Sequence, residues 1–116
     1  MSRTSFDDFK RGEPARSVFR AMGLLEYLEA SESWRSLREL IVDFNGCDRG
    51  EFVEVARNYE GVCSSGERVL LHAILYATDF AWLADELGNG RVWQSFDRVS
   101  GDFKRAVAAC VGAEVW

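Results

Sequence analysis

The longest apolar run in the chain lies within residues 65–87. Between Val69 and Ala77, His72 is the only polar residue. A helix that is apolar on every side is either surrounded by other elements or spans a membrane. The run is far shorter than the roughly 20 residues that a bilayer crossing needs. We therefore expect a long central core helix over about residues 65–87, with Ser64 and Glu67 spaced as a capping box at its start.

Further helices are predicted where apolar residues recur at helical spacing. These stretches cover about residues 14–30, 34–45, 48–60, 92–99 and 102–111. Ser33 stands where a side chain can cap the second stretch, and Gly46 and Gly88 stand where glycine can end a helix. The pattern predicts an all-α fold, a compact array of five to six helices around the long central helix.

The N-terminal residues 1–13 are mostly polar, with Phe6 and Phe9 three positions apart. Two alternatives fit this pattern: a short helix that is anchored by the two rings, or a mobile arm. A terminal segment stays mobile unless its side chains are anchored. We expect residues 1–116 to form a single helical domain, with residues 1–13 as a partly ordered N-terminal arm.

Composition and charge exclude several classes of function. The 116 residues carry a net charge of −5, which disfavours non-specific binding to nucleic acid or to an anionic membrane. The three cysteines, Cys47, Cys63 and Cys110, are far apart in the sequence and odd in number, so we expect reduced thiols. The polar, charged N-terminus does not resemble a signal peptide, and we expect a cytoplasmic protein that does not bind membranes.

No catalytic, metal or nucleotide motif stands out. A single histidine and three scattered cysteines lack the spacing of a metal site. The turn at residues 88–90 has neither the lysine nor the spacing of a phosphate-binding loop. Cys63 stands just ahead of the central helix, and a helix N-terminus lowers the pKa of a thiol. A small apolar role for this residue fits the sequence better, and we expect no catalytic residue, no metal and no cofactor.

His72 and Asp79 are the two polar residues of the central stretch that could line a small-molecule pocket. They lie about two helical turns, or roughly 10 Å, apart, so they do not touch directly. Arg68, one turn before His72, disfavours a charged imidazole. A structural role fits both residues better: His72 as a core-edge histidine with one hydrogen-bond partner, and Asp79 paired with Arg20, Arg57 or Arg98.

Residues 26–60 are the most acidic part of the chain, with nine acidic and four basic side chains. Such a run is usually an ordinary solvated face. It can also dock on a basic protein or replace nucleic-acid phosphates on such a protein. The candidate partner-binding residues are Glu39, Asp43, Glu51, Glu54, Arg57 and Trp116. The short turn after residue 45 has the length of a helix-turn-helix, but Glu51 and Glu54 would oppose phosphate, so direct nucleic-acid binding is not expected.

Two classes of function remain. The first is a small acidic protein-binding module, of the type found among inhibitors, immunity proteins, antitoxins and phage-encoded antagonists of host defence. It would act on a basic protein partner, including a nucleic-acid-binding one. The alternative is a small-molecule-binding protein or an enzyme with a pocket at His72 and Asp79. The missing catalytic constellation favours the first class, while the partner and the oligomeric state stay open.

Overall fold

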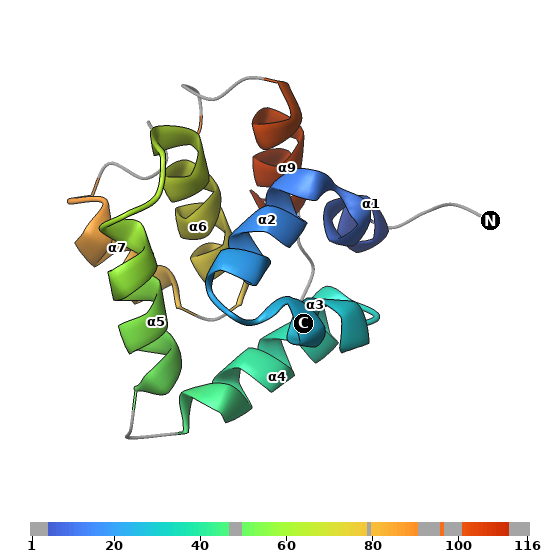
Figure 1. Ribbon diagram of the computed structural model, residues 1–116, viewed down its shortest axis with the longest axis horizontal. Coiled ribbons are helices and arrows are strands. Elements are labelled where there is room, and N and C mark those ends of the chain that lie inside the picture. The colour runs from blue at the N-terminus through green and yellow to red at the C-terminus, as the bar shows by residue number, and fades with distance from the viewer. Residues whose placement is uncertain (1–4, 47–49, 79, 91–95, 97–100, 112–116) are drawn as a thin grey trace.

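A computed structural model of the chain describes residues 5–46, 50–78, 80–90, 96 and 101–111. These residues contain eight helices and no strand (Figure 1). The helices are α1 Ser5–Arg11, α2 Glu13–Ala21, α3 Leu25–Ala30, α4 Trp34–Asn45, α5 Glu51–Glu60, α6 Ser65–Ala77, α7 Ala81–Leu87 and α9 Gly101–Val111. The expected all-α fold is confirmed.

Helix α6 is the buried centre of the array. Seven of its 13 residues are buried, all of them between Leu70 and Ala77. The helix packs against α2, α5, α7 and α9, and it lies in the middle of Figure 1. Its predicted capping box is present, because the Ser64 hydroxyl accepts from the Glu67 N–H and the Glu67 carboxylate accepts from the Ser64 N–H at 2.8 Å. Burying each large side chain contributes about 1.5–3 kcal/mol, so this helix organises the core.

The expected continuous helix over residues 65–87 is not confirmed, because the chain turns between α6 and α7. The Thr78 hydroxyl donates to the Ile74 carbonyl at 2.8 Å, and the Phe80 N–H donates to the Leu75 carbonyl at 2.9 Å. Local bonds of this kind compete with the regular helical ladder. Phe80 is then buried against Phe52 of α5, with the ring centroids 4.9 Å apart.

The stretch 14–30, expected as one helix, is divided into α2 and α3 at Gly23. Gly23 has a φ of +77°, a left-handed conformation that glycine adopts at little cost. The Leu24 N–H donates to the Phe19 carbonyl at 2.8 Å and the Gly23 N–H donates to the Arg20 carbonyl at 3.0 Å. These two bonds form a Schellman motif, which ends α2.

Residues 5–11 form a docked helix, the first of the two alternatives for the N-terminal segment. Phe6 and Phe9 are buried, and both rings contact Trp34 of α4, with centroid distances of 5.1 and 4.7 Å. Aromatic pairs of this kind add about 0.5–1.5 kcal/mol beyond the area that they bury. The Lys10 ammonium also donates to the Ser31 carbonyl at 2.7 Å. Helix α1 is therefore anchored to the core, and it packs beside α9.

The ends of α4 follow the sequence. The Ser33 hydroxyl accepts from the Ser36 N–H at 3.2 Å, and Gly46, with a φ of 65°, ends the helix. Helix α5 begins at Glu51. Asp48, which starts the expected stretch 48–60, lies outside the described residues.

Candidate functional site

The side chain of Asn45, at the end of α4, joins this helix to the start of α5. Its side-chain Oδ1 accepts from the N–H groups of Phe52 and Val53, at 3.0 and 3.2 Å. These two groups belong to the first turn of α5, where backbone N–H groups have no partner inside the helix. The last residue of α4 therefore caps the following helix. The sequence indicated only that the chain stops being helical near this position.

Four of the candidate partner-binding residues lie on the two helices that Asn45 joins, and all four are exposed. Glu39 and Asp43 lie on α4, and Glu51 and Glu54 lie on α5. Residues three or four positions apart share one face of a helix, so each pair projects from a single face. The two helices pack against each other and meet at a corner in Figure 1. We call these four residues the acidic corner.

Three carboxylates of the acidic corner, those of Glu39, Asp43 and Glu54, form no ion pair with any residue that the structure describes. Other acidic side chains do pair with arginines, as Glu29 does with Arg16 at 3.3 Å. An exposed charge contributes little to stability even when it is paired. The unpaired carboxylates of the acidic corner are therefore available to a second molecule.

Two exposed apolar side chains lie on α4 and on α7, the helix that packs against α5. Val42, which is 41 % exposed, lies on the same face of α4 as Glu39. Trp82 of α7 is 54 % exposed and lies one turn from Glu86, which forms an ion pair with Arg57 of α5. Tryptophan is enriched among residues that dominate interface energies. The sequence did not single out Val42 or Trp82 as contact residues, because their exposure depends on how the helices pack.

Arg57, another of the candidate contact residues, is engaged within the molecule. It lies on the exposed side of α5 and its guanidinium holds the Glu86 carboxylate, which links α5 to α7. Trp116 lies outside the described residues, and its role as a contact stays a prediction.

His72 is buried, with 4 % of its side chain exposed. Neither ring nitrogen has a hydrogen-bond partner among the described residues, so the single partner expected from the sequence is not seen there. Its Nε2 lies 4.0 Å from Glu60 Oε1, which in turn lies 3.2 Å from Arg68 Nε. Burial lowers the pKa of His72; the Glu60 carboxylate opposes this shift and the Arg68 guanidinium adds to it. The imidazole is therefore neutral near pH 7.

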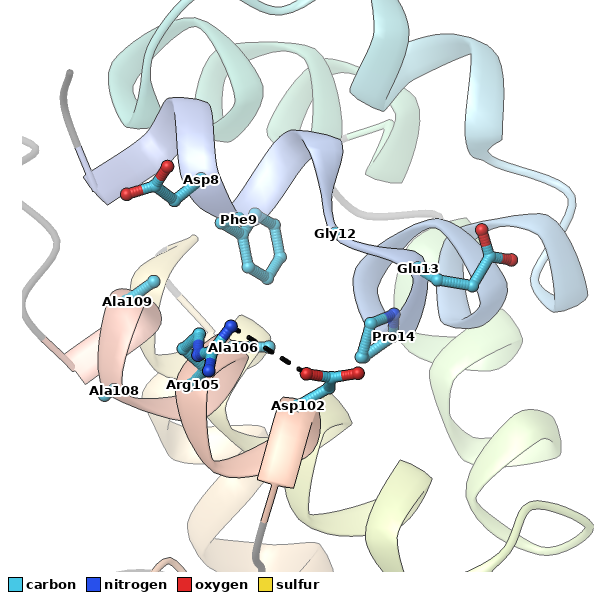
Figure 2. Close-up of a pocket in the computed structure, with 10 residues that line it drawn as sticks. All are labelled: Asp8, Phe9, Gly12, Glu13, Pro14, Asp102, Arg105, Ala106, Ala108 and Ala109. Carbon is cyan, nitrogen blue, oxygen red and sulfur yellow. Dashed lines mark ion pairs between the residues drawn. The ribbon is translucent and has the colours of Figure 1, made fainter.

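One cavity among the described residues is lined by other residues than His72. It has a volume of about 660 Å³ and opens between α1, the start of α2 and α9 (Figure 2). Asp79 lies outside the described residues, so a pocket at His72 and Asp79 stays a prediction. Burial raises the pKa of Cys63, although Arg68 opposes the shift, and this thiol is protonated rather than activated.

Two searches of the described residues bear on other classes of site. No three potential metal ligands from histidine, cysteine, aspartate and glutamate come together there. Within the same part of the chain, none of the helices combines the length and the apolar character that a bilayer crossing requires.

Comparison with known proteins identifies no relative of this chain. No protein-family model matches the chain, and neither curated proteins nor solved structures give a significant match.

Proposed function

We propose that this chain is a protein-binding module that docks on a basic protein through the acidic corner. The observation that carries the proposal is the set of exposed carboxylates on α4 and α5, three of which have no ion pair among the described residues. Charges of this kind add little to the fold, but they accelerate and orient association with an oppositely charged surface. The net charge of −5 acts in the same direction over longer distances.

The contact should extend beyond the four carboxylates. A standard interface buries about 800 Å² on each partner, which is more than two short helical faces supply. Helix α7 packs against α5 and is joined to it by the Arg57–Glu86 ion pair, and we expect its exposed Trp82 to extend the contact. An apolar anchor surrounded by charged groups is the usual composition of a protein interface. A module of this kind acts by occupying its partner, as inhibitors, immunity proteins and antagonists do.

The test is capture of a partner by charge variants of the full chain. The tagged protein would be incubated with lysate of the organism that encodes it, with and without nuclease, and retained proteins would be identified by mass spectrometry. The variant Glu39→Lys/Asp43→Lys reverses two charges of the acidic corner. We expect it to lose a stoichiometric partner that the wild-type chain retains, because complementary charge becomes repulsion.

The matched control is Glu13→Lys/Asp102→Lys, which changes the net charge by the same amount on α2 and α9. This variant should keep the partner, and circular dichroism should show both variants folded. Retention of the partner by the corner variant, or its loss from both variants, would contradict docking at the acidic corner. So would a partner that disappears when nucleic acid is digested.

A further inference from the structure

The chain contains the dipeptide Asn–Gly twice, as Asn45–Gly46 and as Asn89–Gly90. Asparagine followed by glycine is the pair that deamidates most readily, because glycine has no side chain to hinder the attack of its backbone nitrogen on the asparagine Cγ. The two pairs lie in different settings: Asn45 is the last residue of α4, and Asn89 lies in the exposed turn that follows α7. The structure therefore distinguishes two sites that are equivalent in the sequence.

The side-chain amide of Asn45 is held in place. Its Oδ1 accepts from the N–H groups of Phe52 and Val53, at 3.0 and 3.2 Å. To bring its Cγ onto the Gly46 nitrogen, the side chain would have to turn and release both hydrogen bonds. Two N–H groups in the first turn of α5 would then lose their acceptor. The capping role of Asn45 therefore protects this residue from attack.

The side-chain amide of Asn89 has no such restraint. Asn89 is exposed, and its side chain forms no hydrogen bond with any residue that the structure describes. The attacking nitrogen does not distinguish the two pairs, because its N–H is bonded in both. The Gly90 N–H donates to the Asp85 carbonyl at 2.9 Å, and the Gly46 N–H donates to the Asp43 carbonyl at 3.1 Å. The two pairs therefore differ in the freedom of the asparagine side chain.

We propose that Asn89–Gly90 is a site of spontaneous deamidation, and that the capping role of Asn45 protects Asn45–Gly46 in the folded chain. The Gly90 nitrogen loses its proton and bonds to Asn89 Cγ, the Cγ–Nδ2 bond breaks, and the amide nitrogen leaves as ammonia. Water then opens the resulting succinimide at either of its two carbonyls, which gives aspartate or isoaspartate. The reaction consumes one water and involves neither oxidation nor reduction.

The modification acts on the end of α7. Either product places a new carboxylate just after the C-terminus of this helix, where negative charge is unfavourable. Isoaspartate also lengthens the main chain by one methylene and displaces the Gly90 N–H from the Asp85 carbonyl. Helix α7 carries the exposed Trp82, and its Glu86 pairs with Arg57 of α5. Deamidation should therefore loosen α7 at its C-terminal end, independently of docking at the acidic corner.

The experiment follows both Asn–Gly pairs in one sample. The full chain would be kept at mildly alkaline pH, folded and, separately, in urea, and sampled over days. Cleavage after arginine places the two pairs in different peptides, and mass spectrometry measures the conversion of amide to acid in each. In the folded chain we expect Asn89 to be converted about tenfold or more faster than Asn45, because two hydrogen bonds must break before the Asn45 amide can turn. In urea the two rates should converge.

Two controls locate the reaction. Asn58 is exposed on α5 and is followed by tyrosine, so it should be converted more slowly than Asn89 in both samples. Asn89→Gln should remove the fast conversion, because the longer side chain cyclises far more slowly, and circular dichroism checks that this variant is folded. An Asn45 rate equal to or above that of Asn89 in the folded chain, or an Asn89 rate no higher than that of Asn58, would overturn the proposal. A difference between Asn45 and Asn89 that persists in urea would also overturn it, because the neighbouring sequence rather than the cap would then be its cause.

Discussion

At the scale of single residues, His72 couples the stability of the core to pH. Burial lowers its pKa in the folded chain below the ordinary value of about 6.5 that it has when unfolded. Below that pH the unfolded chain binds a proton that the folded chain does not take up. The contribution that neutral His72 makes to the stability of the fold is therefore fully present above the pKa of the unfolded state. It is lost as the pH falls towards the pKa of the folded state. Arg68 strengthens this dependence and Glu60 weakens it.

Replacing His72 by leucine tests this coupling. Urea unfolding between pH 7.5 and 5 should show a flatter dependence in His72→Leu than in the wild-type chain, by up to about 1.4 kcal/mol per pH unit. At pH 7 the variant should be as stable or more stable, because an unpaired buried donor costs about 1–3 kcal/mol. The same pH slope in both proteins would mean that the imidazole titrates normally. A large loss of stability in the variant at pH 7 would mean that the imidazole has a hydrogen-bond partner.

At the scale of helices, the sequence predicts those ends that have a strong local cause. The Ser64–Glu67 capping box and the left-handed Gly46 are confirmed, since each depends on a few neighbouring residues. The breaks at Gly23 and Thr78 were not predicted. Apolar spacing continues across both of them, because the helices on either side face the same core. The periodicity of the sequence reports which residues are buried, but not where the backbone turns between them.

Asn45 is the residue through which two helices depend on each other. Asn45→Ala removes the acceptor for two N–H groups of α5 and should lower the free energy of unfolding by about 1 kcal/mol. Asn45→Asp keeps an acceptor oxygen, and its negative charge is favourable at the N-terminus of α5 but unfavourable at the C-terminus of α4, so this variant should lose less stability than Asn45→Ala. Urea denaturation measures both variants. Equal losses in the two would show that the side-chain oxygen does not cap α5.

At the scale of the whole molecule, contacts between distant segments produce features that the sequence did not indicate. Helices α1 and α9 come from opposite ends of the chain and pack side by side, and the cavity lies between them. The exposure of Val42 and Trp82 also depends on which helix faces pack inward. By contrast, the acidic residues of α4 and α5 were proposed as contacts from their charge alone. Their exposure is now described, and their binding role stays a prediction.

The distribution of ion pairs predicts which carboxylates support the fold. Glu39 and Asp43 lie four positions apart on α4, and like charges at this spacing oppose each other by a few tenths of a kcal/mol. Neither forms an ion pair with a described residue. Carboxylates on other helices are held by arginines, at 3.2 Å in the pair of Glu60 and Arg68. If the acidic corner serves binding rather than stability, then removing its charge should leave the fold intact.

The triple variant Glu39→Gln/Asp43→Asn/Glu54→Gln changes the net charge from −5 to −2. At low ionic strength we expect its free energy of unfolding to stay within about 0.5 kcal/mol of the wild-type value or to rise, because only unpaired charges are removed. A control makes the same change in net charge at carboxylates that do pair with arginines: Glu13→Gln/Glu29→Gln/Glu60→Gln. Urea denaturation should show the control to be the less stable variant, by about 1 kcal/mol, with the difference shrinking as salt is added. A larger loss of unfolding free energy in the corner variant than in the control would mean that these carboxylates stabilise the fold. No binding partner would then be needed to explain why they are on the surface.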